Sequence, residues 1–199
     1  MQEAALELFE ERGYAGTTAA EVAERAGLTE RTFFRHFPDK REVLFADNDL
    51  RDRLTVAVAD ADEGVAPLEA VAAGLDTVAG VLQGRRHETV ARRARVVAAH
   101  PELQERELAK LASWSEALGG ALVGRGLPRR DAELLAEVSI VVFRVAYERW
   151  LDERPERALS ETIHETFAEL GGLFVHAAPG PQDTILPARA RAVTRRGDL

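Results

Sequence analysis

The most informative part of the sequence is Thr17–Leu44, which reads TTAAEVAERAGLTERTFFRHFPDKREVL. Thr18 and Glu21 have the spacing of a capping box, in which a hydroxyl and a carboxylate satisfy free backbone N–H groups at a helix start. The predicted helix ends near residue 26, a Gly-Leu pair makes a tight turn, and Thr29 is placed to cap a second, very short helix. Pro38 ends this second helix because proline cannot continue one. Two short helices joined by a tight turn predict a helix-turn-helix.

Further helices are predicted on both sides of this segment. Apolar residues at helical spacing predict a helix over residues 2–12, which Gly13 ends. On the other side, Asp39 is placed to cap a longer helix that continues to about Asp60. Its expected apolar positions are Val43, Leu44, Leu50, Leu54 and Val58. This longer helix is expected to connect two parts of the protein.

The rest of the chain continues the helical pattern. Residues 60–67, DADEGVAP, are polar and contain glycine and proline, so they predict a loop. Beyond them, apolar spacing predicts helices at 68–82, 86–99, 101–123, 131–152 and 160–177. Residues 178–199 show no sustained apolar period and are predicted to be a disordered tail. The predicted fold class is therefore all-α.

The composition agrees with a helical protein and excludes several classes of function. The chain is 46% apolar and 30% charged, and it is rich in residues that favour helix. It contains no cysteine, which excludes disulfides, thiolate metal sites and thiol catalysis. No apolar run reaches the roughly 18 residues that a membrane span needs, so we expect a cytoplasmic protein without a membrane partner. The net charge of -8 argues against a protein that coats nucleic acid non-specifically, and any DNA contact has to use a local basic face.

The segment Thr17–Leu44 resembles the helix-turn-helix of the TetR family of transcriptional regulators. The resemblance is carried by the paired threonines, the Val-Ala pair, the Ala-Gly turn, the Thr-Phe-Phe run and the His-Phe-Pro-x-Lys ending, which occur together and in register. The sequence departs from the family pattern at Phe34, where relatives often have tyrosine, and at Ala20, where some have arginine. It also begins inside the first helix, without the basic arm of many relatives.

The resemblance implies a sequence-specific DNA-binding regulator, expected to be a repressor that a small-molecule effector releases from a palindromic operator. It implies an N-terminal three-helix helix-turn-helix domain over residues 1–45 and a larger helical ligand-binding and dimerisation domain over residues 46–177. The implied partners are double-stranded DNA, a second copy of the chain and an effector of unspecified identity. No cofactor and no metal is implied.

The very short second helix of the motif is expected to present its outer side to the major groove of DNA. We expect four apolar residues to fill the three-helix core, namely Val22, Leu28, Phe33 and Phe37. Arg31 and Arg35 then face outward one turn apart, where a guanidinium either reads guanine edges or holds a phosphate. The resemblance adds Thr18, Thr29, Thr32 and Lys40, which match family positions that commonly touch phosphate. Such contacts fix the register of a protein on DNA. The complete set of expected DNA contacts is Thr17, Thr18, Thr29, Glu30, Arg31, Thr32, Phe34, Arg35, His36 and Lys40.

Dimerisation is expected because one short recognition helix buries too little surface for specific binding, so helix-turn-helix proteins pair to read two half-sites. Apolar stripes on the last two helices are expected to form an intermolecular four-helix bundle, as in the family, or to pack within one subunit. The expected interface residues are Leu134, Val138, Val142, Val145, Ile163, Phe167, Leu170 and Phe174.

An effector pocket is expected between the connecting helix and those two helices. Mostly apolar residues with a few polar groups are typical of small-molecule sites. The expected lining residues are Leu75, Leu82, Val97, Leu111, Trp114, Leu118, Phe143 and Tyr147. A basic run, consisting of Arg85, Arg86, Arg92, Arg93 and Arg95, either attracts an anionic effector or forms a solvated helix face.

Two other classes of function are alternatives to a DNA-binding regulator. An enzyme is not expected, because the sequence has no glycine-rich phosphate loop, no HExxH motif and no nucleophile elbow, and its five histidines lack metal-ligand spacing. The alternative to a DNA-binding repressor is a dimeric ligand sensor that keeps the fold and has lost DNA binding.

Overall fold

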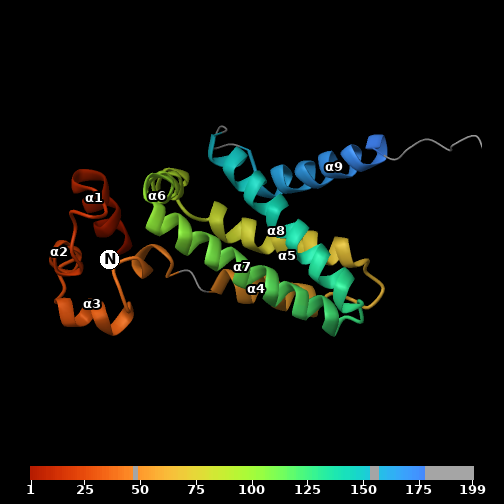
Figure 1. The fold of residues 1–199 in the computed structure, drawn as a ribbon, viewed down its shortest axis with the longest axis horizontal. Helices are drawn as coiled ribbons and strands as arrows, with labels where there is room; N and C mark the ends of the chain where they lie inside the picture. The colour runs from red at the N-terminus through yellow and green to blue at the C-terminus, as the bar shows by residue number, and fades with distance from the viewer. Residues whose placement is uncertain (47–48, 153–156, 178–199) are drawn as a thin grey trace, which may run out of the picture.

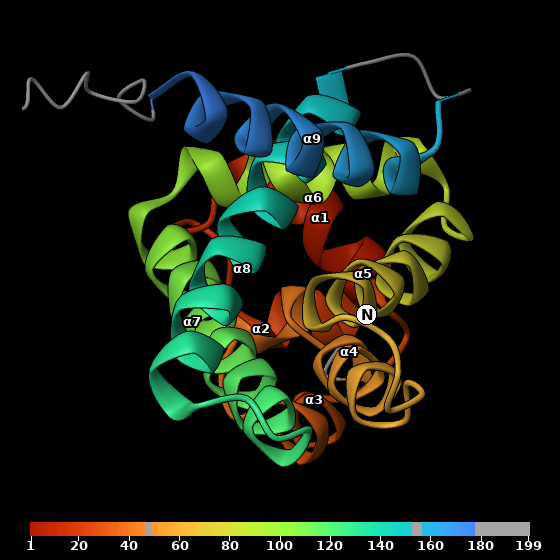
Figure 2. The same ribbon diagram turned by 90° about the vertical axis from the view of Figure 1, so that its right-hand side faces the viewer.

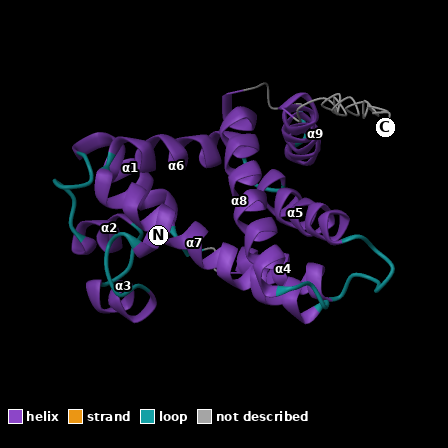
Figure 3. Cartoon of the chain, turned by 45° about the vertical axis from the view of Figure 1, so that its right-hand side comes forward, coloured by secondary structure: helices purple, strands orange, loops and turns teal. Residues whose placement is uncertain are grey.

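The computed structural model describes residues 1–46, 49–152 and 157–177. In these ranges it contains helices and loops and no strand (Figure 3). The helices are α1 Gln2–Arg12, α2 Ala19–Arg25, α3 Glu30–His36, the 3₁₀ helix η1 Glu42–Leu44, α4 Asp49–Ala59, α5 Pro67–Gln83, α6 His87–Ala99, α7 Pro101–Gly124, α8 Arg129–Asp152 and α9 Leu159–Ala177. The predicted all-α class is confirmed. None of the helices in the described ranges has both the length and the apolar character needed to cross a membrane.

The helix-turn-helix forms because both of its helices are capped as predicted. The Thr18 hydroxyl accepts a hydrogen bond from the Glu21 N–H at 3.2 Å, and the Glu21 carboxylate accepts one from the Thr18 N–H at 2.8 Å. The Thr29 hydroxyl accepts from the Thr32 N–H at 3.2 Å. Between the helices, Gly27 has a φ of 70°, a left-handed conformation that glycine adopts without strain. The local sequence therefore sets where α2 and α3 begin.

The predicted continuous helix from Asp39 to Asp60 is wrong. The structure has η1 and the separate helix α4 in its place. Asp39 does act as a cap, because its carboxylate accepts from the N–H of Arg41 at 2.7 Å and of Glu42 at 3.3 Å, but the turn that it caps is only η1. Leu44 is fully buried in the N-terminal core, whereas α4 packs against α5 and α7. The predicted helix is interrupted after η1 because η1 packs in the N-terminal core, whereas α4 packs in a second core.

The N-terminal core is shared between the helix-turn-helix and the larger helical part. Its buried residues include Leu6, Phe9, Val22, Phe33, Val43, Leu44 and Phe45, together with Val96 and Val97 from α6 and Leu103 from α7. The predicted core position of Leu28 is wrong, because its side chain is 41% exposed and its N–H bonds to the Ala23 carbonyl in the turn. Helices α1–α3 lie at one end of the molecule, beside α6 and the start of α7 (Figure 1).

A second core joins α4, α5, α7, α8 and α9. It includes Leu54, Leu75, Leu118, Phe143, Trp150 and Ile163. Helices α4 and α5 pack closely at Gly74, where an added Cβ would lie 2.8 Å from Val58 Cγ2 and 3.2 Å from the Leu54 carbonyl oxygen. Helix α9 runs across one side of this bundle and packs against α8 and α5 (Figure 2). The two cores together fix the helix-turn-helix relative to the bundle.

Candidate DNA-binding surface and effector pocket

Helix α3 is oriented by one fully buried residue. Phe33 has no exposed surface, and its ring centroid lies 5.2 Å from that of Phe37 and 5.5 Å from that of Phe34. The hydroxyls of Thr29 and Thr32 lie 3.0 Å apart at the start of the helix. Because Phe33 faces inward, the opposite side of α3 is turned to solvent.

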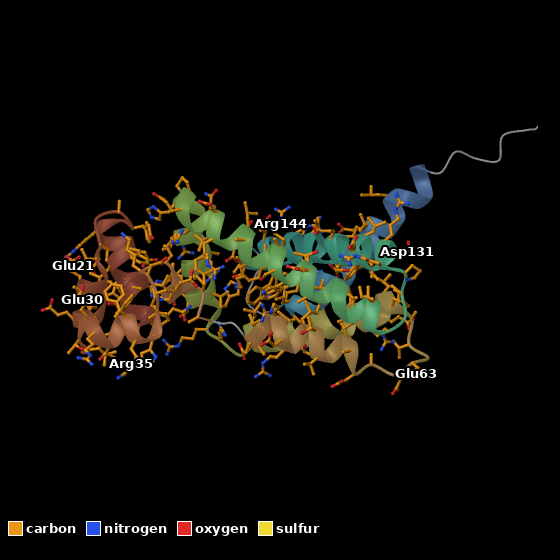
Figure 4. All side chains as sticks on the ribbon, turned by 60° about the horizontal axis from the view of Figure 1, so that its bottom comes forward. Glu21, Glu30, Arg35, Glu63, Asp131 and Arg144 are labelled. Atoms are coloured by element: carbon orange, nitrogen blue, oxygen red, sulfur yellow. The ribbon has the colours of Figure 1, made fainter. Side chains whose placement is uncertain are left out.

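The outer face of α3 consists of Glu30, Arg31, Phe34, Arg35 and His36, all of them exposed. Phe34 is 51% exposed, so its ring lies on the solvent side of the helix together with the charged residues. Arg31 and Arg35 are one turn apart, about 6 Å along the helix axis. Figure 4 shows Glu30 and Arg35 at the end of the molecule opposite Asp131 of α8. This face is unobstructed by the rest of the protomer.

The arginines of the outer face differ from the other arginines of α1–α3. Arg12 pairs with Glu21 at 2.9 Å, and Arg25 pairs with Glu7 and Glu11, both at 3.0 Å. The hydrogen bond from Arg25 also lowers the pKa of Glu11. Across the described residues, no carboxylate lies within ion-pair distance of Arg31 or Arg35, and Arg35 has only His36 nearby at 3.4 Å. Arg12 and Arg25 are thus neutralised by carboxylates of α1 and α2, while the two arginines of α3 have no carboxylate partner among the described residues.

Two of the expected DNA contacts, Thr17 and Lys40, hold the loop between α1 and α2. Thr17 is 1% exposed, and its hydroxyl donates to the carbonyls of Leu8 at 3.2 Å and Gly13 at 2.9 Å. The Lys40 ammonium donates to the carbonyls of Tyr14 at 2.6 Å and Thr17 at 2.9 Å, and burial lowers its pKa. The Thr17 side chain is therefore a structural tie, and we do not retain it as a DNA contact. Lys40 has one donor left for a phosphate.

A cavity of about 730 Å³ lies between α6, α7 and α8, within the usual size range of ligand pockets. Six of the expected lining residues do line it, namely Leu82, Val97, Leu111, Trp114, Phe143 and Tyr147. Leu118 and Leu75 do not, because both are completely buried in the second core. The rings of Trp114 and Phe143 lie 5.7 Å apart, and those of Phe143 and Tyr147 lie 6.0 Å apart. One wall of the cavity is therefore aromatic.

The polar part of the cavity centres on Arg93, whose residue is 9% exposed. Its Nε donates to the Leu44 carbonyl of η1 at 2.8 Å, and its Nη2 donates to Glu107 at 2.7 Å. Burial raises the pKa of Tyr147, and the charge of Arg93 partly opposes that rise. Burial alone would raise the pKa of Glu107, but the charges of Arg93 and Lys110 outweigh it and hold that pKa below the ordinary value. Arg93 thus connects the cavity wall to the helix-turn-helix part.

The basic run, which begins in the turn before α6 and continues into that helix, does not act as a unit. Arg85, Arg93 and Arg95 line the cavity. Arg92 bonds instead to Glu3 and Glu10 of α1, at 2.6 Å and 2.7 Å, and so ties α6 to the first helix. Neither of the two alternatives drawn from the sequence describes the whole run.

Sequence comparison assigns both parts of the chain. The profile of bacterial regulatory proteins of the tetR family matches residues 3–46, and the profile of the MftR C-terminal domain matches residues 65–174, more than half of the chain. The chain belongs to the TetR family. Its members are transcriptional regulators with a helix-turn-helix, and not enzymes.

Individual TetR-family relatives agree with this assignment. The regulator TcmR of Streptomyces glaucescens is 38% identical over 77 residues, a match that covers 38% of this chain and 34% of TcmR, about a third of that protein. A protein of Mycobacterium tuberculosis that carries the name mycofactocin biosynthesis transcriptional regulator MftR is 25% identical over 177 residues, covering 86% of this chain and 87% of that one. Among solved structures, a TetR-family regulator from Mesorhizobium loti aligns with a TM-score of 0.53 at 21% identity, covering 88% of this chain and 93% of that one, which shows the shared fold.

The expected dimer residues divide into an exposed stripe and a buried set. On α8, Leu134 is 66% exposed, and Val138 and Val145 are half-buried along the same side. By contrast, Val142 is 3% exposed and Ile163 is fully buried, so both pack within one protomer and we do not retain them in the interface. On α9, Phe167 packs partly against the second core and Leu170 is half-buried, while the side chain of Phe174 lies outside the described residues.

Sequence reasoning missed two exposed residues of this surface. Val141 is 50% exposed on α8 and Leu173 is 68% exposed on α9. The sequence did contain a signal for Val141. Residues 134, 138, 141 and 145 are separated by four, three and four positions, a spacing that places them on one side of a helix. Sequence reasoning also missed Glu107 of the cavity, and no local pattern identifies it, since its partner Arg93 lies on another helix.

Proposed function

We propose that this TetR-family protein is a homodimeric repressor that binds a palindromic operator through α3 and leaves it when a small molecule fills the cavity. In this proposal, the DNA-binding domain comprises residues 1–45, and the effector-binding and dimerisation domain comprises residues 46–177. The observation that carries the proposal is the outer face of α3, a capped and oriented helix with two arginines that pair with no carboxylate in the described ranges.

The two arginines are proposed to read bases, with phosphate contacts around them. Arg31 and Arg35 present forked donors that match the acceptor edge of guanine in the major groove. Thr18, at the exposed start of α2, and Thr29, at the start of α3, stand where hydroxyls and backbone N–H groups bind phosphate. Lys40 contributes its remaining donor. Phe34 adds an apolar contact in the middle of the outer face.

A dimer is proposed because reading two half-sites requires two recognition helices about 34 Å apart, one turn of DNA or a multiple of it. The exposed stripe of α8, with Leu134, Val138, Val141 and Val145, is the surface proposed to pair with a second copy, together with Leu170 and Leu173 of α9. Such a contiguous apolar stripe on a folded helix marks an interaction surface.

The cavity is proposed to regulate this dimer by a shift of population. A ligand that binds better to the form with badly spaced recognition helices lowers DNA affinity by the same coupling factor, typically about 1–3 kcal/mol. The cavity is suited to this role because α6 carries both its wall and its ties to the helix-turn-helix. Arg92 bonds to α1 and Arg93 bonds to η1 from the same helix.

The test is a mobility-shift titration of the purified protein on the DNA upstream of its own gene, at two salt concentrations. We expect saturable binding to one palindromic segment, with an affinity that falls as salt rises, because phosphate contacts release counterions. Changing Arg31 and Arg35 to alanine should remove the shift. A matched control changes Arg129 and Arg130, two exposed arginines at the start of α8, which alters the net charge equally and should leave binding intact.

An absence of binding at low salt would contradict the proposal. It would favour the alternative, a ligand-binding dimer that has lost DNA binding. Loss of binding in both double variants would show that only overall charge matters and would remove α3 from the proposal.

A further inference from the structure

Arg93 is the group on which the cavity and the helix-turn-helix part converge. It is nine-tenths buried, and it bonds at once to Glu107 in the cavity and to the Leu44 carbonyl in η1. Its guanidinium carbon also lies 5.0 Å from the centre of the Phe45 ring. A change in the hydrogen-bond partner of Arg93 in the cavity therefore acts directly on the backbone of η1.

The charges around the cavity favour an anion. Five cationic residues line it, Arg85, Arg93, Arg95, Lys110 and Arg144, against three acidic residues, Glu107, Glu148 and Asp152. Of these acids, Glu107 bonds to Arg93, whereas Glu148 pairs with Arg144 at 3.3 Å. Glu107 therefore occupies the position that a ligand anion would need.

The apolar part of the cavity adjoins this position. Trp114 and Leu111 of α7 and Phe143 of α8 line the cavity, and the Lys110 ammonium lies 5.3 Å from the centre of the Trp114 ring. A ligand body placed on these residues extends toward Arg93 and Lys110. The cavity lining thus combines apolar and aromatic residues with cationic groups beside them, which suits an amphipathic molecule with one charged group.

We propose that the effector is an apolar molecule ending in a single anionic group, which displaces the Glu107 carboxylate from Arg93 and draws the guanidinium away from the Leu44 carbonyl. This inference rests on the proposed function, in which the cavity is the effector site. It assigns the charge of the ligand and names Arg93 as the positioning residue that transmits binding to the helix-turn-helix part.

The consequence for η1 follows from its other contacts. Val43, Leu44 and Phe45 are buried in the N-terminal core, so a displacement of η1 moves side chains that α1 packs against. Glu42 stays bound to Arg106 of α7 at 2.9 Å, so η1 remains attached at one end while the Leu44 carbonyl is released. The loss of one buried hydrogen bond thereby becomes a movement of α1–α3 relative to α6.

The test uses two fluorescent probes with the same ring system. Anilinonaphthalene sulfonate carries one negative charge, and N-phenylnaphthylamine lacks the sulfonate and is neutral. Each is titrated into the full-length protein without DNA, and its fluorescence increase is measured. We expect the anionic probe to bind about tenfold more tightly than the neutral one, the ratio typical of one hydrogen bond to a charged group.

Variants separate the charge of the cavity from general effects. Glu107→Gln removes the competing carboxylate and should tighten binding of the anionic probe about tenfold, with no change for the neutral probe. The matched control is Glu105→Gln, which removes a charge from an exposed position of α7 that does not line the cavity. The double variant Arg93→Gln with Glu107→Gln leaves no buried charge unpaired at that bond, and it should lose most of the preference for the anionic probe, with only the remaining cationic lining residues favouring it.

The link to η1 is read by hydrogen exchange of the amides of residues 42–45. We expect faster exchange with the anionic probe bound and unchanged exchange with the neutral one. Equal affinity for both probes, or no effect of Glu107→Gln, would overturn the assignment of the ligand, and equal exchange with both probes would overturn the role of Arg93. These experiments contain no DNA, so a failure to bind an operator and a failure of this proposal are distinguishable.

Discussion

Changing Arg31 and Arg35 to alanine tests whether the outer face of α3 reads bases or only holds phosphates. Both side chains are exposed and without an ion-pair partner in the described part of the chain, so their removal leaves no buried group unsatisfied and should not affect folding. Each substitution occurs twice in a dimer. Four contacts of about 1–3 kcal/mol each amount to about 4–12 kcal/mol if all four read bases.

This loss is as large as the whole difference between specific and non-specific binding, which is about 4–10 kcal/mol. We therefore expect the double variant to bind its operator no better than scrambled DNA, while its affinity for scrambled DNA changes little. The assay is a titration of both DNAs at several salt concentrations, with wild type and variant side by side. Unchanged melting temperature of the variant serves as the control for folding.

The salt dependence of the affinity distinguishes base contacts from phosphate contacts of the two arginines. If the arginines held phosphates, affinity for both DNAs would fall alike, and the slope of log K against log salt would shrink by about 0.9 for each lost contact, about 3.6 in total. That result would refute base contact by Arg31 and Arg35 and leave specificity to other residues of the outer face.

Other substitutions test single features of the structure. Phe34→Tyr adds a hydroxyl at a half-exposed position and should tighten operator binding by about 1 kcal/mol per half-site, measured by titration; weaker binding would show that the ring contacts an apolar surface. Thr18→Ala removes the hydroxyl that accepts from the Glu21 N–H at the start of α2 and should lower the free energy of unfolding in urea by about 1 kcal/mol. Gly74→Ala places a Cβ 2.8 Å from Val58 Cγ2 and should cost about 1–3 kcal/mol in the same assay, whereas an unchanged midpoint would mean that α4 and α5 separate freely. The pKa of Glu107 is lowered in the folded protein, so its ionised form stabilises the fold above its ordinary pKa, and this contribution disappears as pH falls through the lowered value. The melting temperature of wild type should thus fall more steeply than that of Glu107→Gln below about pH 4.5, and parallel curves would contradict the shift.

Local sequence chemistry determined the helix-turn-helix. The capping threonines of α2 and α3, the Gly27 turn and the stop at Pro38 act through neighbours a few residues away, and the structure has each of them where the sequence predicts. The all-α class followed equally from helical spacing and composition. The exposure of Arg31 and Arg35 followed from Phe33, because one buried ring sets which side of a short helix faces outward.

Tertiary packing decided the features that depend on distant residues. The helix expected after Asp39 breaks because η1 is buried against α1, α6 and α7, while α4 is buried against α5. Val142 and Ile163 fit the apolar spacing expected for a dimer interface, but both side chains are buried inside one protomer.

The polar network of the cavity was also outside the reach of the sequence. Arg93 meets Glu107 from the next helix and the carbonyl of Leu44 from a turn 49 positions earlier in the chain. Periodicity reports which side of a helix is apolar, because that depends only on positions a few residues apart. It carries no information on which partner a buried charge meets across the fold, because that is fixed only when the helices pack.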